Sequence, residues 1–116
     1  MIKSSCGLRV CDIETSIEWY EHFLGFTCVH KSSIKNPDYA VLEKEQARIY
    51  LVSDREQKSF ASNIVVFETS GLEAEFSKLE EKGVIFRSSI SESQFGGEEF
   101  SIKDYEDNIL IYRRNA

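Results

Sequence analysis

Few side chains in this sequence are suited to nucleophilic or metal chemistry. The histidines are His22 and His30, and the cysteines are Cys6, Cys11 and Cys28. A catalytic Cys–His pair needs a third group that orients the histidine, and nothing in the sequence positions one. The cysteines are odd in number and lack C-x-x-C spacing, so we expect free thiols in a reducing compartment, which indicates the cytoplasm.

The composition is that of one globular domain, and it excludes several functions. The chain has 116 residues, of which 41% are hydrophobic and 29% are charged, as in ordinary folded domains. Lysine and arginine total 14 against 20 aspartates and glutamates, which gives a net charge of −6 and argues against a nucleic-acid partner. No apolar run reaches the ~18 residues of a membrane-spanning helix, and the polar start lacks the apolar core of a signal peptide.

Two copies of one strand–helix pattern position the candidate residues. The first copy predicts a strand over 4–12, a helix over 14–24, a strand over 26–31 and a hairpin of 39–43 with 48–52. The second predicts a strand over 63–68, a helix from 72 to Gly83, a strand over 84–87, a loop over 88–97 and a hairpin of 98–103 with 108–113. Helical apolar positions recur 59 residues later, which indicates duplication. The modules are expected over about 1–56 and 60–116 of a single domain.

Two segments resemble the vicinal oxygen chelate superfamily, which includes glyoxalases, extradiol dioxygenases and bleomycin resistance proteins. Residues 8–26 are similar to its opening pattern, and residues 100–108 are similar to its closing F-x-x-x-D-P-D-G-N hairpin. Tyr105 and Asp107 depart from the proline and the glycine of that hairpin. The resemblance implies an α+β fold, in which two tandem βαβββ modules form a concave, cup-shaped mixed sheet.

The resemblance also implies where a metal would be held. Enzymes of the superfamily usually place His, Gln or Glu at four strand positions to hold one divalent ion. Here these positions fall on Ser5, Tyr50, Ile64 and Ile111. None of these side chains is a good ligand for a hard divalent ion, so we expect no metal and no other cofactor. The two histidines are expected to be surface or packing residues.

Strand alternation separates the side chains that would line the cup from those that would meet the helices. The side chains on the same face as the four implied metal positions give the cup an apolar middle, with arginines toward the strand ends. Apolar walls with few polar groups suit a small-molecule pocket, and arginines suit a carboxylate, a phosphate or a stacked aromatic ring; the alternative for the arginines is a solvated rim. The expected lining is Ser5, Gly7, Arg9, Arg48, Tyr50, Val52, Ile64, Val66, Ile109, Ile111 and Arg113.

A loop aromatic is the last candidate for the site. Residues 94–100 are similar to a W-G-x-R-x-F segment of bleomycin-resistance-type members, with Phe95 in place of the tryptophan and no arginine. Phe95 is expected to border the ligand groove, the alternative being a flexible loop with one apolar anchor. Phe60 is a second candidate wall residue. The predicted ligand-binding set is Tyr50, Arg48, Ile64, Phe95, Ile109, Ile111, Arg113 and Ser5, with no catalytic and no metal-binding residue.

The expected function is a metal-free small-molecule binding protein of the bleomycin-resistance type, which sequesters an apolar or aromatic ligand in the cup. The alternative is a metal-dependent glyoxalase-type lyase or isomerase, or a dioxygenase, which would show bound metal and activity. A third reading is a regulatory or immunity-type protein that binds a macromolecule and no small ligand. Two-module members of the superfamily usually form twofold dimers, so a homodimer is expected.

Overall fold

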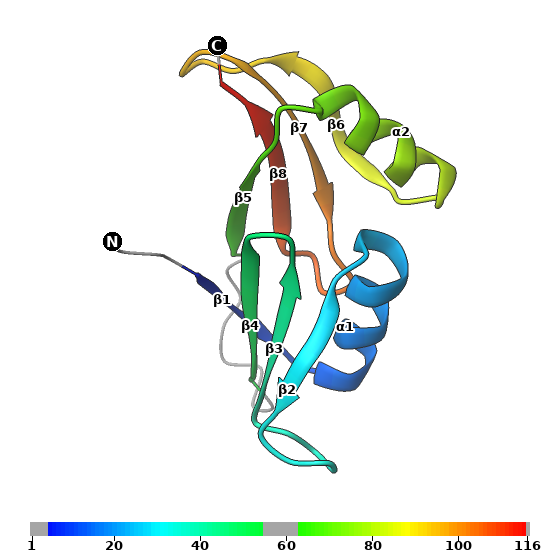
Figure 1. The fold of residues 1–116 in the computed structure, drawn as a ribbon, viewed down its shortest axis with the longest axis vertical. Coiled ribbons are helices and arrows are strands. Elements are labelled where there is room, and N and C mark those ends of the chain that lie inside the picture. The colour runs from blue at the N-terminus through cyan, green and yellow to red at the C-terminus, as the bar shows by residue number, and fades with distance from the viewer. Residues whose placement is uncertain (1–4, 55–62, 116) are drawn as a thin grey trace. The chain divides into compact units, whose positions relative to one another are not determined.

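A computed structural model describes residues 5–54 and 63–115 of the chain. The chain divides into two compact units, Met1–Asn63 and Ile64–Ala116, here called unit 1 and unit 2. Each unit has one four-stranded sheet with a helical segment packed against it (Figure 1). Among the described residues, no helix has the length and apolar character needed to cross a membrane. The module boundary expected near 56–60 and the candidate Phe60 lie outside the described residues.

Unit 1 has the strand order β1-β4-β3-β2. Its strands are β1 (Cys6–Val10), β2 (Thr27–Lys31), β3 (Tyr39–Lys44) and β4 (Ala47–Ser53). β1 runs parallel to β4, while β3 is antiparallel to β4 and to β2. A helical segment that starts with α1 (Ile13–Trp19) connects β1 to β2. The carboxylate of Asp12 caps α1 by accepting the Thr15 N–H at 3.1 Å, which satisfies one of the free backbone donors of the first turn.

The helix predicted over 14–24 is not one regular α-helix. After Trp19 the backbone continues as a π-helical segment, η1 (Tyr20–Leu24). Tyr20 and Leu24 are buried there, and the Tyr20 ring lies 5.9 Å from that of Phe26. Gly25 then ends the segment with φ 76°, a left-handed conformation that favours glycine. Apolar spacing alone does not distinguish an α-helical turn from the wider π-helical one, so the sequence predicted the segment but not its type.

Unit 2 repeats this topology. Its elements are β5 (Ile64–Glu68), α2 (Leu72–Glu81), β6 (Phe86–Glu92), β7 (Glu98–Lys103) and β8 (Ile109–Arg114). The strand order β5-β8-β7-β6 corresponds to β1-β4-β3-β2, and β5 runs parallel to β8 as β1 does to β4. A parallel pair needs a crossover connection, and a helical segment supplies part of it in each unit. The predicted α+β fold with two βαβββ modules is therefore confirmed.

The loop predicted over 88–97 is partly wrong, because β6 continues to Glu92. The serine-rich composition of 88–91 suggested a loop, but these residues pair with β7 in an irregular register. The Ser88 and Ser101 hydroxyl oxygens lie 2.7 Å apart across the two strands. Pairing with a neighbouring strand has thus overridden the local preference, and only a shorter turn remains between β6 and β7.

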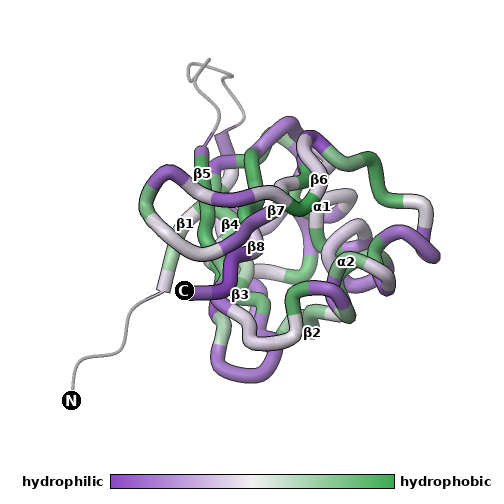
Figure 2. Tube along the Cα trace, turned by 90° about the horizontal axis from the view of Figure 1, so that it is seen from above, coloured by the Kyte–Doolittle hydropathy of each residue, from purple (hydrophilic) through white to green (hydrophobic). Residues whose placement is uncertain are grey.

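Each sheet buries the face that its helical segment covers. In unit 1 the buried side chains include Leu8, Val10, Ile49 and Leu51, and in unit 2 they include Val65, Leu110 and Tyr112. Figure 2 shows much of the hydrophobic sequence on the strands, while α2 mixes hydrophobic and hydrophilic residues. Covering one face of each sheet leaves the opposite face without a helical cover in its own unit.

The hairpin between β7 and β8 is held by a buried carboxylate. Asp104 Oδ1 accepts the backbone N–H groups of Glu106 and Asn108, and its Oδ2 accepts the Asn108 side-chain amide, each at 2.9 Å. Asp107 has φ 65°, which explains why the resembling family places glycine there. Aspartate tolerates this conformation better than most residues, so the turn forms without the glycine.

Candidate functional site

The uncovered sheet faces carry the predicted site residues. We call Gly7, Arg9, Arg48, Tyr50 and Val52, with the residues beside them on β3 and β2, the unit 1 face. We call Ile64, Val66, Ile109, Ile111 and Arg113, with the residues beside them on β7, the unit 2 face. The predicted alternation is confirmed: Gly7, Arg48, Ile64 and Val66 are exposed, while their chain neighbours Leu8, Ile49 and Val65 are buried. Ser5 is exposed just before β1.

Tyr50 lies in the middle of the unit 1 face. It is half-buried in β4, with Gly7 beside it on β1 and Val41 beside it on β3. Gly7 has no side chain, so it leaves that flank of the phenol ring uncovered. Tyr50 therefore offers a ring and a hydroxyl together, and Val41 extends its apolar surface.

Arg48 is already engaged in an ion pair. Its Nε donates to Glu43 Oε2 at 2.7 Å, and its Nη2 donates to the same oxygen. Glu43 lies opposite Arg48 in the β3–β4 register. The Glu43 carboxylate, with a further contribution from the Tyr50 hydroxyl, raises the pKa of Arg48 above its usual value. Arg48 thus contributes little free positive charge to the unit 1 face.

Sequence reasoning missed the β2–β3 part of the unit 1 face. Register places Tyr39 opposite Val52 and places Val41 between Tyr50 and His30. Tyr39 Oη and His30 Nε2 lie 3.4 Å apart. The alternation of residues 39–43 could have identified Val41, but the register shift between Cys28 and His30 has no clear signal in the sequence.

The unit 2 face has an apolar strip. Ile64 lies beside Ile109, and Val66 lies beside Ile111. Ile64 is 62% exposed and Val66 is 50% exposed, while Ile109 and Ile111 are half-buried. Four adjacent aliphatic side chains on an uncovered face form the kind of surface that marks a binding or interaction site.

Arg113 and the turn that contains Phe95, between β6 and β7, lie at one end of the apolar strip. Arg113 Nη2 donates to the Gly96 carbonyl oxygen at 2.6 Å, so the structure places Arg113 beside the turn that contains Phe95. Phe95 itself is 87% exposed. Arg113 Nε is buried from solvent, and no described residue accepts its hydrogen bond. A buried donor without a partner costs free energy.

A hydroxyl pair at the other flank of the strip was also missed by sequence reasoning. Ser101 lies opposite Ile111 on β7 and is buried. Besides its contact with Ser88, its hydroxyl accepts a long bond from Arg87 Nη1 at 3.4 Å. Residues 88–97 were predicted as a loop, so Ser88 had no predicted strand partner and was not considered as a site residue.

The thiols and the implied metal positions offer little reactive chemistry. Cys6, Cys11 and Cys28 are free, and burial raises the pKa of the Cys6 thiol, which disfavours the nucleophilic thiolate. The described residues contain no cluster of three or more His, Cys, Asp or Glu side chains that could hold a metal ion. The implied metal positions Ser5, Tyr50, Ile64 and Ile111 do not fit a hard divalent ion.

Comparison with protein families assigns the chain to a known superfamily. Residues 4–111 match the family described as Glyoxalase/Bleomycin resistance protein/Dioxygenase superfamily. The chain belongs to this superfamily. The match covers both units, so the resemblance drawn from residues 8–26 and 100–108 is confirmed. No curated protein matches the chain significantly.

Solved structures of the superfamily share the fold at low sequence identity. A bleomycin-binding protein complexed with bleomycin is 16% identical, with a TM-score of 0.83 and full coverage of both chains. The antibiotic binding protein TnmS3 from Streptomyces sp. CB03234 is 15% identical, with a TM-score of 0.80, covering 100% of this chain and 98% of its own. Lactoylglutathione lyase from Agrobacterium tumefaciens is 11% identical, with a TM-score of 0.79 and coverages of 97% and 92%. Binding proteins and an enzyme thus share this fold, so the fold alone does not select the function.

Proposed function

We propose that the chain is a small-molecule binding protein of the bleomycin-resistance type, which sequesters an apolar or aromatic ligand in the cytoplasm without a metal. The observation that carries this proposal is the exposed aliphatic strip of the unit 2 face. Ile64 and Val66 are largely exposed, although full burial of such a side chain is worth about 1.5–3 kcal/mol. A ligand that covers the strip would recover part of this free energy.

One polar side chain and one aromatic side chain of unit 2 would orient such a ligand. The half-buried Arg113 side chain would donate from its guanidinium group to a ligand carbonyl, phenol or carboxylate oxygen. Phe95, held near Arg113 through Gly96, would cover an edge of the molecule. The unit 1 face, taken by itself, offers a second surface on which a flat ring would stack against Tyr50. Arg48 is a weaker candidate than Arg113, because Glu43 already occupies its guanidinium group.

The chemistry of the implied metal positions supports a binding protein over an enzyme. Metal-dependent members need oxygen or nitrogen ligands that leave sites open for substrate. Ile64 and Ile111 carry no lone pair, and Ser5 and Tyr50 are poor ligands in their neutral forms. The superfamily members named for bleomycin and antibiotic binding support the same class.

Metal analysis tests this proposal. Protein dialysed without chelator should hold no stoichiometric divalent ion, because the four positions supply no ligand set. Added zinc, nickel, iron or manganese should leave the melting temperature unchanged, since only an ion that binds the native state raises it. One such ion per chain in elemental analysis would contradict the proposal and favour the lyase, isomerase or dioxygenase alternative.

We also propose a homodimer with an isologous interface. Exposed apolar residues such as Ile34 and Ile85 provide apolar surface for association. Light scattering should return a mass near twice 13.4 kDa at micromolar concentration. A mass near one chain under those conditions would rule the dimer out without affecting the ligand proposal.

A further inference from the structure

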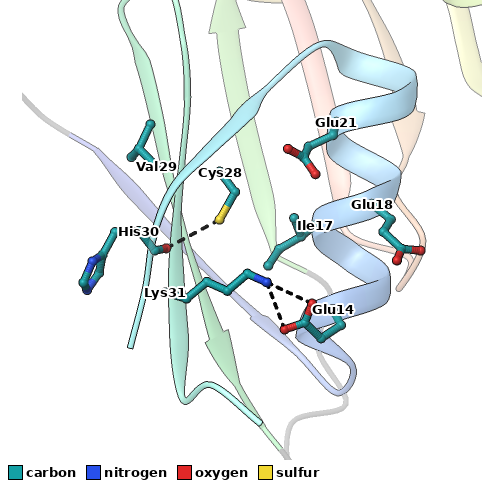
Figure 3. Close-up of a pocket in the computed structure, with 8 residues that line it drawn as sticks. All are labelled: Glu14, Ile17, Glu18, Glu21, Cys28, Val29, His30 and Lys31. Carbon is teal, nitrogen blue, oxygen red and sulfur yellow. Dashed lines mark hydrogen bonds and ion pairs between the residues drawn. The ribbon is translucent and has the colours of Figure 1, made fainter. Parts of the chain in front are cut away.

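A groove runs between α1 and the edge strand β2 of unit 1. It has a volume of about 410 Å³ and is lined by Glu14, Ile17, Glu18, Glu21, Cys28, Val29, His30 and Lys31. Figure 3 shows Cys28 and Lys31 pointing toward the helix and His30 pointing away from it. The groove shares His30 with the unit 1 face, but Tyr50 and the other residues named for that face do not line it.

One wall of the groove is an unpaired sheet edge. β2 pairs with β3 on one side only, since it ends the strand order of unit 1. The Ser32 N–H donates to the Tyr39 carbonyl at 3.0 Å, while Lys31 lies opposite Ala40. Successive strand residues alternate the direction of their backbone groups, so the N–H and C=O of Lys31 point away from β3. This edge is open to pairing with another strand.

The bulge in β2 leaves this pairing surface usable. The register shift lies between Cys28 and His30, and bulges are one means by which proteins protect sheet edges. The residues from His30 to Lys31 nevertheless keep regular pairing with β3. Four of the five residues of β2 are exposed, and in the described part of unit 1 no strand pairs with its outer edge.

The other wall of the groove is acidic. Glu14, Glu18 and Glu21 lie three or four residues apart along α1 and η1, a spacing that places them on one side of the helical segment. Lys31 Nζ pairs with Glu14 Oε2 at 3.2 Å. Glu18 and Glu21 form no ion pair with any described residue. Figure 3 shows the Glu21 carboxylate on the side facing β2, while the Glu18 carboxylate points away from β2 and contributes its charge to the helix wall from the outside.

We infer that this groove binds an extended, basic peptide segment of a partner protein, which adds to the edge of β2 as a fifth strand. Backbone hydrogen bonds to β2 would supply affinity, and pockets for alternate side chains would supply specificity, as in strand addition between a sheet edge and a helix. Lysine or arginine side chains of the segment would reach Glu18 and Glu21, and its small apolar side chains would lie over Ile17 and Cys28. An acidic or neutral segment would lack this complementarity.

A peptide titration tests the inference. The probe is an acetylated, amidated hexapeptide of alternating lysine and valine, and the matched control peptide has glutamate in place of lysine. The protein variant is Glu18→Lys with Glu21→Lys. Its control is Glu80→Lys with Glu81→Lys, which reverses two exposed charges in the last turn of the α2 helix of unit 2.

We expect the lysine peptide to bind and the glutamate peptide not to bind. The Glu18/Glu21 variant should bind at least tenfold more weakly, and the Glu80/Glu81 variant should stay within twofold of the unchanged protein. Raising the salt concentration should weaken binding, because exposed charges are screened. Amide hydrogen exchange in residues 27–31 should slow at least tenfold at saturation, because strand addition occupies outward N–H groups.

Several results would overturn the inference. Absence of binding at millimolar peptide would do so, and so would equal weakening by the two charge-reversal variants, which would indicate attraction to the net acidic surface. Peptide binding without slower exchange in 27–31 would exclude strand addition. Equally tight binding of spermidine at Glu18 and Glu21 would make the groove a site for small cations. None of these outcomes bears on the ligand proposed for the unit 2 face.

Discussion

Replacing Phe100 with alanine is expected to lower the free energy of unfolding by about 3–5 kcal/mol. Phe100 is 0% exposed, and it contacts both the sheet and the helix of the unit 2 core. Its ring stacks on that of Tyr112 at 4.9 Å and meets the edge of Phe76, on α2, at 5.2 Å. Alanine would leave a cavity between the sheet and the helix, because the surrounding rings can close it only in part.

Phe95→Ala is the matched control for Phe100→Ala. The substitution is chemically identical, but Phe95 is 87% exposed, so the free energy of unfolding should change by no more than ~0.5 kcal/mol. Urea unfolding measures both values. Similar destabilisation by the two variants would contradict the assignment of Phe100 to the core and Phe95 to the surface.

Replacing Tyr50 with alanine is expected to weaken the binding of a flat ligand to the unit 1 face at least tenfold. A stacked aromatic contact is worth about 0.5–1.5 kcal/mol beyond the buried area, and ~1.4 kcal/mol is tenfold in affinity. The probe is the uncharged fluorescent molecule N-phenylnaphthylamine, which is flat and largely apolar. Tyr105→Ala, an exposed tyrosine in the unit 2 hairpin turn, should leave the dissociation constant unchanged.

The rival account makes Tyr50 a packing residue that fills a former metal position. Under that account Tyr50→Ala would lower stability by a few kcal/mol and leave the affinity of the folded variant unchanged. Tyr50→Phe separates the contributions of the ring and the hydroxyl, since it removes only the hydrogen-bonding group. An unchanged dissociation constant for Tyr50→Ala would remove Tyr50 from the site.

The sequence predicted the topology because alternation and helical spacing are local signals. Residues 6–10 and 47–53 show clear alternation, and burial follows it in the structure. The helical apolar positions recur 59 residues later, so the elements predicted for one copy could be checked against those predicted for the other. Strand β6 was mostly missed because its pairing with β7 depends on tertiary contacts that a run of serines does not reveal.

The composition of the site was less accessible from sequence than its location. The family resemblance placed Tyr50 and Ile64 on uncovered faces. The partner that each charged side chain binds could be seen only in the structure. The ion pair of Arg48 with Glu43 and the bond from Arg113 to Gly96 depend on register and turn geometry. The sequence left Arg48 and Arg113 as equal candidates for orienting a ligand, and the bond from Arg48 to Glu43 makes Arg48 the weaker of the two.

The most direct test of the central claim is a fluorescence titration of chelator-dialysed protein with N-phenylnaphthylamine. The account predicts saturable binding with a dissociation constant that does not change when zinc, nickel or manganese is restored, because the ligand rests on aliphatic and aromatic side chains. Binding that appears only after metal is added, or no saturable binding at all, would contradict a metal-free small-molecule binding protein.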